Sequence, residues 1–177
     1  MHTTSKKLPA NEAELKALIE CAVADMFANQ PDIFDFTPET GQTEWNLAHH
    51  LALELREAFP PLSHDFDVLK RNYDNRRPDI IFHKRRTHRF NYLVIEVKRD
   101  ATQREVSEDA EKIKTYWFKA PLRYVFGATV DLRSNGKHNV QVFKNEIRGN
   151  CAEARKDADR KIGGPRYPIR KISAGEK

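Results

Sequence analysis

The run FNYLVIEVK, at residues 90–98, places two charged residues in a strand-forming segment that is otherwise apolar apart from Asn91. Three aliphatic residues lead directly into Glu96, Val97 and Lys98. β-branched and aromatic residues favour strands. Charged side chains are rarely buried unless a partner or a metal ion compensates them. The run therefore predicts a central strand that carries functional groups near its carboxyl end.

A second strand candidate, PDIIFHK at residues 78–84, is joined to this run by a short polar connection. Such a connection favours an antiparallel hairpin, in which paired residues have a constant sum of sequence numbers. Asp79 and Glu96 then lie beside each other. Side chains alternate along a strand, so Glu96 and Lys98 share one face. The hairpin therefore predicts that two carboxylates and one amine meet at one end.

These residue types suit metal-assisted hydrolysis of a phosphodiester. Hard cations such as Mg²⁺ are held by carboxylates, waters and substrate phosphate oxygens. The bound metal neutralises charge, orients the substrate and lowers the pKa of a water molecule. A neighbouring lysine can hold that water, help to deprotonate it and stabilise charge on the phosphate. The alternative is a strand-entry aspartate and a solvated Glu-Lys pair, but the apolar strand favours the functional interpretation.

The patterning along the rest of the chain predicts an α/β (α+β) fold. Helical spacing marks residues 11–28, 43–59 and 104–118, and strand patterning marks 66–73, 78–84, 90–98, 123–132 and 138–146. This order predicts a small mixed sheet flanked by helices, with a crossover connection between the third and fourth strands. Residues 1–147 are interpreted as one domain with an N-terminal helix, and residues 148–177 as a basic, flexible tail.

The charge is unevenly distributed along a chain whose net charge is +5. Residues 70–89 hold eight Lys or Arg against two acidic residues, whereas residues 1–40 hold three against seven. Basic blocks suggest a polyanionic partner, and arginine offers paired donors to phosphate. The candidate nucleic-acid contacts are Arg76, Arg77, Arg85, Arg86 and, on the third helix, Lys112.

Several other classes of protein do not fit the sequence. No apolar stretch approaches the roughly 20 residues that span a bilayer, and the first residues lack the apolar core of a secretory signal. Cys21 and Cys151 form neither a zinc cluster nor a disulfide framework. A cytoplasmic location and no membrane partner are therefore expected.

The pattern around residues 43–131 resembles the PD-(D/E)XK nuclease superfamily, whose fold is restriction-endonuclease-like with an αβββαβ core. The resemblance implies that Asp79 and Glu96 bind Mg²⁺, for which Mn²⁺ can substitute, with the Val97 carbonyl as a further ligand. It also implies that Lys98 positions the attacking water.

Two further features belong to the same resemblance. Glu44, on the first turn of the second helix, shares the apolar stripe of that helix, where it is either a helix-dipole residue or a site group. The resemblance implies that it completes the metal shell. Lys112 and Tyr116 have the spacing of the Gln-x-x-x-Tyr motif found in some branches, with lysine in place of glutamine.

The sequence therefore predicts a Mg²⁺-dependent endonuclease, with DNA favoured over RNA as substrate. Two alternatives stay open. One is a catalytically silent nucleic-acid-binding module, although the residues whose loss would mark it are all present. The other is a nuclease subunit of a larger complex. A homodimer is also plausible, because one small domain leaves target specificity unexplained.

Overall fold

The fold is described from a computed structural model, in which residues 7–34, 43–60, 62–68, 76–85 and 90–146 are placed. In chain order, the elements are α1 (Glu12–Asn29), α2 (Thr43–Arg56), β1 (Ser63–Phe66), β2 (Ile80–His83), β3 (Asn91–Arg99), α3 (Gln103–Lys112), the π-helix η2 (Ile113–Trp117), β4 (Phe126–Leu132) and β5 (His138–Lys144). The predicted tail, residues 148–177, lies outside the described residues.

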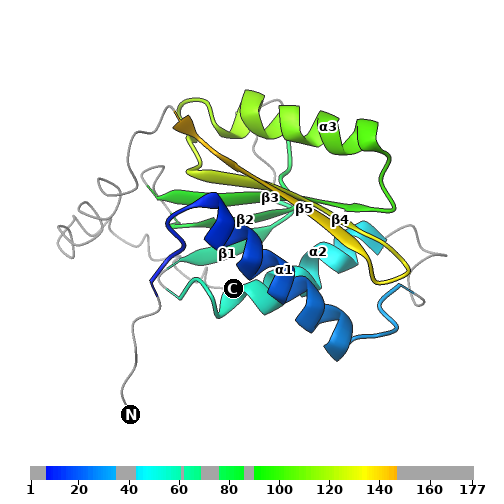
Figure 1. Cartoon of the computed structure of the whole chain (residues 1–177). Helices are drawn as coiled ribbons and strands as arrows, with labels where there is room; N and C mark the ends of the chain where they lie inside the picture. The colour runs from blue at the N-terminus through cyan, green and yellow to red at the C-terminus, as the bar shows by residue number, and fades with distance from the viewer. Residues whose placement is uncertain (1–6, 35–42, 61, 69–75, 86–89, 147–177) are drawn as a thin grey trace, which may run out of the picture.

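The five strands form one mixed sheet in the order β1-β2-β3-β4-β5. The β1–β2, β2–β3 and β4–β5 pairs are antiparallel. β3 and β4 pair in parallel, so α3 and η2 form the crossover between them. Helices α1 and α2 lie on one face of the sheet and α3 on the other (Figure 1). The predicted α/β class, the hairpin and the crossover are therefore confirmed.

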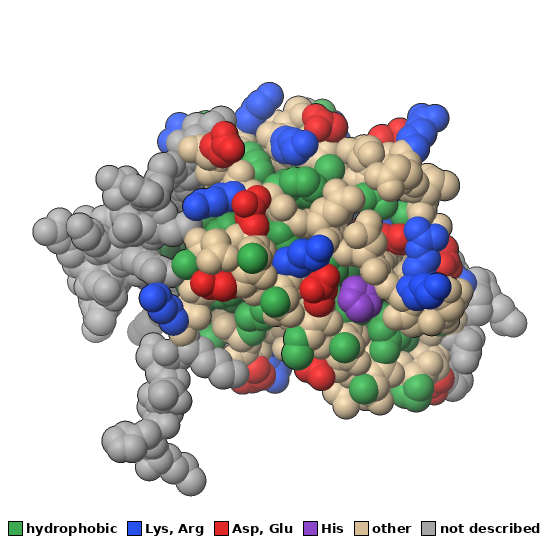
Figure 2. Space-filling model, viewed as in Figure 1, with side chains coloured by type: hydrophobic (Ala, Val, Ile, Leu, Met, Phe, Trp, Pro, Cys, Tyr) green, Lys and Arg blue, Asp and Glu red, His purple; other side chains and the backbone are tan. Residues whose placement is uncertain are grey.

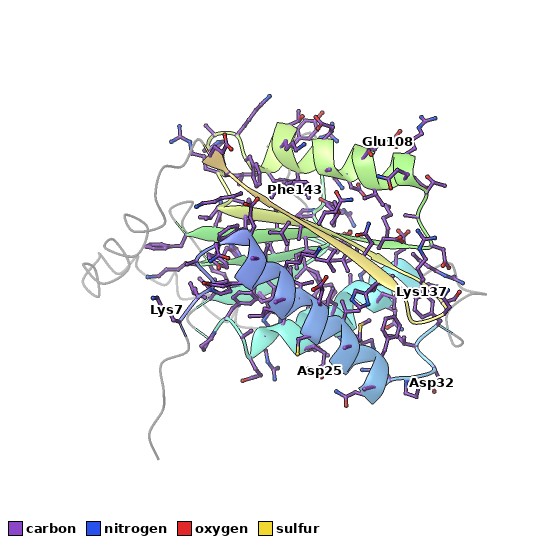
Figure 3. All side chains as sticks on the ribbon, viewed as in Figure 1. Lys7, Asp25, Asp32, Glu108, Lys137 and Phe143 are labelled. Carbon is purple, nitrogen blue, oxygen red and sulfur yellow. The ribbon has the colours of Figure 1, made fainter. Side chains whose placement is uncertain are left out.

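Two apolar clusters hold these layers together. The larger one packs the apolar stripes of α1 and α2 against the sheet, and the stripe predicted for α2 is buried there, with Leu47, Leu51 and Leu55 fully enclosed. The smaller cluster lies on the opposite face, where Trp117 and Tyr124 are fully buried. Side chains fill the layer between α1 and the sheet (Figure 3). Because β3 contributes to both clusters, it is buried on both faces, as its composition predicted.

The element boundaries differ most from the sequence prediction at the first strand and at the third helix. The first strand is β1, at Ser63–Phe66, rather than residues 66–73, of which 69–73 lie outside the described residues. Asp67 has a positive φ of 49°, a conformation that ends extended structure. The third helix does not continue as an α-helix to residue 118, because it widens into η2 after Lys112.

The surface that carries α1 and β5 has mixed charge. Lys and Arg side chains alternate there with Asp and Glu side chains (Figure 2). Such a surface does not favour a polyanion, so basic residues that contact nucleic acid would have to gather elsewhere. Among the described residues, no helix has the length and apolar character needed to span a membrane.

Candidate active site

The register of β2 and β3 brings the two predicted carboxylates together. Ile80 pairs with Ile95, so Asp79, directly before β2, lies next to Glu96. The Val97 amide donates a 2.7 Å hydrogen bond to Oδ2 of Asp79. This contact holds the aspartate against the β3 backbone at the point where β2 begins. The adjacency predicted from the hairpin is therefore present.

Glu96 is buried, with 2% of its surface exposed. Its Oε1 accepts a 2.8 Å hydrogen bond from Nε1 of Trp117, and its Oε2 accepts one of 2.5 Å from Nζ of Lys112. Burial, followed by the charge of Asp79, raises the pKa of Glu96 to about 7. Burial also raises the pKa of Asp79. The site therefore holds two interacting carboxylates that are short of positive charge.

Lys98 and Glu44 meet at the edge of this pair. Lys98 Nζ lies 3.4 Å from Oε2 of Glu44, and the Arg99 amide donates to Oε1 of Glu44 at 3.3 Å. Burial lowers the pKa of Lys98, but the charges of Glu44, Asp109 and Asp79 outweigh it and raise the pKa overall. Glu44, in the first turn of α2, thus lies beside Lys98 and helps to keep Lys98 protonated.

Two residues of the site were not predicted from the sequence. Asp109 of α3 interacts electrostatically with Lys98 and Lys112, and burial raises its pKa. Trp117 of η2 is buried in the smaller apolar cluster, and its indole also binds Glu96. For Asp109, the available signal in the sequence was its position three residues before Lys112 on a predicted helix. The contact of Trp117 depends on η2, which the sequence did not indicate.

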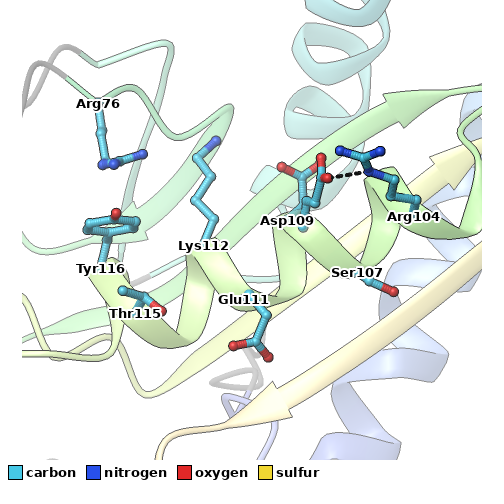
Figure 4. Close-up of a pocket in the computed structure, with 9 residues that line it drawn as sticks. Arg76, Arg104, Ser107, Asp109, Glu111, Lys112, Thr115 and Tyr116 are labelled. Atoms are coloured by element: carbon cyan, nitrogen blue, oxygen red, sulfur yellow. Dashed lines mark hydrogen bonds and ion pairs between the residues drawn. The ribbon is translucent and has the colours of Figure 1, made fainter.

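An open groove of about 570 Å³ runs along α3, and Lys112, which binds Glu96, is one of the residues that line it. Lys112, Asp109, Tyr116 and Arg76 contribute to its lining (Figure 4). The guanidinium of Arg76 lies 3.5 Å from the centre of the Tyr116 ring. This stacking holds the guanidinium against the ring, and its Nε is buried without a hydrogen-bond partner among the described residues. Of the predicted basic contacts, Arg76 and Lys112 therefore lie at the groove itself.

The other predicted basic contacts are differently placed. Arg77 forms an exposed 3.1 Å ion pair with Asp67. Arg85 is paired with Asp65, which also binds His83 at 2.7 Å. Arg86 lies outside the described residues. The structure thus gathers Arg76 and Lys112 at the site, and it engages Arg77 and Arg85 in ion pairs with residues at β1.

The donor set fits a hard divalent cation. Asp79 and Glu96 supply two adjacent carboxylates of the kind that such a cation takes. The described residues contain no group of three or more His, Cys, Asp or Glu side chains that could hold a metal ion. The N–H and C=O of an extended residue point toward the same neighbouring strand. Because the Val97 amide binds Asp79, the Val97 carbonyl points to that side as well. Buried carboxylates of raised pKa are stabilised by a bound cation.

No protein-family model, no curated protein and no solved structure matches this chain. Any assignment of function therefore depends on the geometry of the site.

Proposed function

We propose that this protein is a Mg²⁺-dependent nuclease of the PD-(D/E)XK type that hydrolyses phosphodiester bonds in DNA. The observation that carries the proposal is the placement of Asp79 beside Glu96, with Lys98 two residues further along β3. A buried carboxylate next to a half-buried one, with a lysine at the same strand end, matches the needs of metal-assisted attack on a phosphate.

The arrangement of the elements supports the same proposal. From α2 to β4 the chain follows the order αβββαβ, and it includes an antiparallel β2–β3 hairpin and a parallel β3–β4 pair. This is the order expected of a restriction-endonuclease-like core. Helix α1 and strand β5 are additions outside it. Because a fold alone does not establish a reaction, the side-chain geometry remains the stronger support.

Asp79, Glu96 and the Val97 carbonyl are the proposed ligands of the cation. When bound, Mg²⁺ would neutralise charge at the scissile phosphate and lower the pKa of a coordinated water. The hydrogen bond from the Val97 amide fixes one oxygen of Asp79. The same contact also orients the other Asp79 oxygen. Less conformational freedom is therefore lost when that oxygen binds a cation.

Lys98 is proposed to hold the attacking water and to stabilise charge on the phosphate. Its raised pKa keeps the ammonium protonated at neutral pH, so it acts as a donor rather than as a base. Glu44 lies 3.4 Å from the ammonium and also accepts from the Arg99 amide. Glu44 therefore positions Lys98, in addition to the place in the metal shell that the resemblance implies.

The first experiment is a cleavage panel of plasmid, linear duplex, single-stranded, branched and RNA substrates, with Mg²⁺ or Mn²⁺ against excess EDTA. Cleavage of DNA that requires the cation is expected, because the carboxylates alone cannot activate water at neutral pH. Persistent cleavage in excess EDTA would contradict the metal mechanism.

The second experiment substitutes the site residues. Asp79→Ala and Lys98→Ala should abolish cleavage but retain most DNA binding, since affinity comes from dispersed phosphate contacts. Asp25→Ala, on α1 (Figure 3), is the matched control and should cleave like the wild type. Wild-type cleavage by Lys98→Ala would show that its assigned role is wrong.

A further inference from the structure

Both oxygens of Glu96 are bound by donors from one short segment. Trp117 occupies Oε1 at 2.8 Å, and Lys112 occupies Oε2 at 2.5 Å. Residues five apart point about 140° away from each other in a regular α-helix. The i→i+5 geometry of a π-helix instead brings them to nearly the same side. The 3.1 Å bond from the Phe118 amide to the Ile113 carbonyl marks this wider turn, which explains why both donors reach one carboxylate.

The two donors differ in their freedom to move. Trp117 is fully buried in the apolar cluster beneath α3. The Lys112 side chain is 26% exposed and lines the open groove. Figure 4 shows it projecting from α3 between Arg76 and Asp109. A flexible four-carbon stem that opens onto a groove can swing away from Glu96, whereas the packed indole cannot.

The position of Lys112 conflicts with a cation on the same oxygen. An ammonium at 2.5 Å from Oε2 of Glu96 and a divalent ion bound to that oxygen would lie within a few ångströms of each other. Like charges at such a distance repel strongly in a partly buried site. Either the cation does not bind to Oε2 of Glu96, or the Lys112 ammonium moves away from it. A pair of poorly solvated carboxylates is meanwhile stable only if a proton or a nearby positive charge balances it.

We propose that Lys112 is a built-in counter-ion, which holds Oε2 of Glu96 in the resting protein and is displaced into the groove when a divalent cation binds, while Trp117 keeps Oε1. This inference rests on the proposed cation site. Lys112 thereby neutralises Glu96 in the resting protein. Because it competes with the cation, it also lowers the affinity of the site for that cation. Once displaced, its ammonium lies in the groove beside Arg76.

The test is Lys112→Met in the full chain, with Mn²⁺ binding measured by isothermal titration calorimetry in the absence of nucleic acid. The measurement is made at about pH 8.5, so that protons compete little for the carboxylates. Removal of a competing positive charge at contact distance should tighten Mn²⁺ binding about tenfold or more. An unchanged or weaker affinity would overturn the proposal.

Lys114→Met is the matched control. Lys114 lies two residues away, is 49% exposed on its side chain and pairs with Glu111 rather than with Glu96. Lys114→Met loses the same charge, so a general electrostatic effect would appear in both variants. With the local effect at Glu96 absent, its Mn²⁺ affinity should stay within about twofold of the wild type. If both variants gained affinity equally, displacement of Lys112 from Glu96 would be the wrong explanation.

Lys112→Gln is a second variant in case Lys112→Met fails to fold, because the glutamine amide can still donate to Glu96 without carrying charge. It should also tighten Mn²⁺ binding, and equal affinity to the wild type would count against the proposal. The two levels of inference fail differently. If the wild type and every variant bind no Mn²⁺, the proposed cation site is wrong. If the wild type binds Mn²⁺ as tightly as Lys112→Met, only the counter-ion role of Lys112 is wrong.

Discussion

Glu96 is the residue whose burial most needs an explanation. A carboxylate with 2% exposure loses hydration that its two donors replace only in part. Asp79 adds a second negative charge beside it, and the pKa of Glu96 rises from its ordinary value of 4.5 to about 7. A chain selected for stability alone would gain from an apolar residue here. The cost is consistent with a site group rather than a structural one.

The raised pKa predicts how stability depends on pH without a cation. Between about pH 4.5 and pH 7, folded Glu96 holds a proton that the unfolded chain has released. The free energy of unfolding should therefore fall as pH rises through this window and level off above it. Urea denaturation in EDTA across the window should show this slope in the wild type, and Glu96→Gln should reduce it.

Glu111→Gln is the control for this measurement, because Glu111 is an exposed carboxylate of α3 that pairs only with Lys114 among the described residues. Its pH profile should follow that of the wild type. If Glu96→Gln also followed the wild type, the proton would not be held by the Asp79–Glu96 pair.

Glu44 and Asp79 should differ in the size of their effects. Glu44→Gln removes the charge that faces Lys98 but keeps an oxygen for the Arg99 amide. Asp79→Asn removes charge from a proposed cation ligand. Single-turnover cleavage should therefore slow less in Glu44→Gln than in Asp79→Asn. A large loss of melting temperature in Glu44→Gln, with normal turnover, would instead assign Glu44 to stabilising the start of α2.

At the scale of elements, η2 decides which side chains reach the carboxylates. It packs against β4, where Gly127 lies beneath Ile113. A Cβ added to Gly127 would overlap the Cγ2 methyl of Ile113 and press on Phe118. The absence of a side chain at this position of β4 is what lets the π-helix approach the sheet.

Gly127→Ala should destabilise the protein by about 1–3 kcal/mol through overpacking and should disturb the contact between Trp117 and Glu96. Chemical denaturation measures the first effect. Ile113→Leu removes the branched methyl, so the double variant should recover part of the stability lost in Gly127→Ala. Additive losses in the double variant would contradict the proposed overlap.

The β2–β3 hairpin was predictable because its signals are local. Apolar runs of strand length and a short polar connection predict the pairing, and alternation then places Asp79 by Glu96. The contribution of α3 and η2 was not predictable in the same way. A widened helical turn depends on packing against β4 rather than on the sequence of the turn. The hydrogen bond from Trp117 to Glu96 could therefore not be predicted.

At the scale of the whole molecule, the mixed sheet gathers groups from distant parts of the chain. β2 begins where β3 approaches its end, so Asp79 and Lys98 lie at one edge of the sheet. α2 adds Glu44 from one face, and α3 adds Lys112 from the other. The site is thus formed between the two helical layers, and it can form only when both layers are docked.

The basic residues should divide according to their position. Arg76→Gln, at the groove, should weaken DNA binding, lower the slope of log affinity against log salt by up to about one unit, and slow cleavage at saturation. Arg85→Gln should affect binding less, because the guanidinium is already paired with Asp65. Lys16→Gln on α1 is the control. Equal salt slopes for all three variants would show that DNA does not follow the groove.

The hydrogen bond between Trp117 and Glu96 has a practical consequence. The chain contains two tryptophans, and the other, Trp45, is 48% exposed on α2. In a Trp45→Phe background, Trp117 would be the sole indole fluorophore, attached directly to a proposed cation ligand. Its emission should respond when the charge on Glu96 is neutralised by a different partner. The protein therefore carries an intrinsic optical probe of its own site, which can follow ion binding in real time without any label.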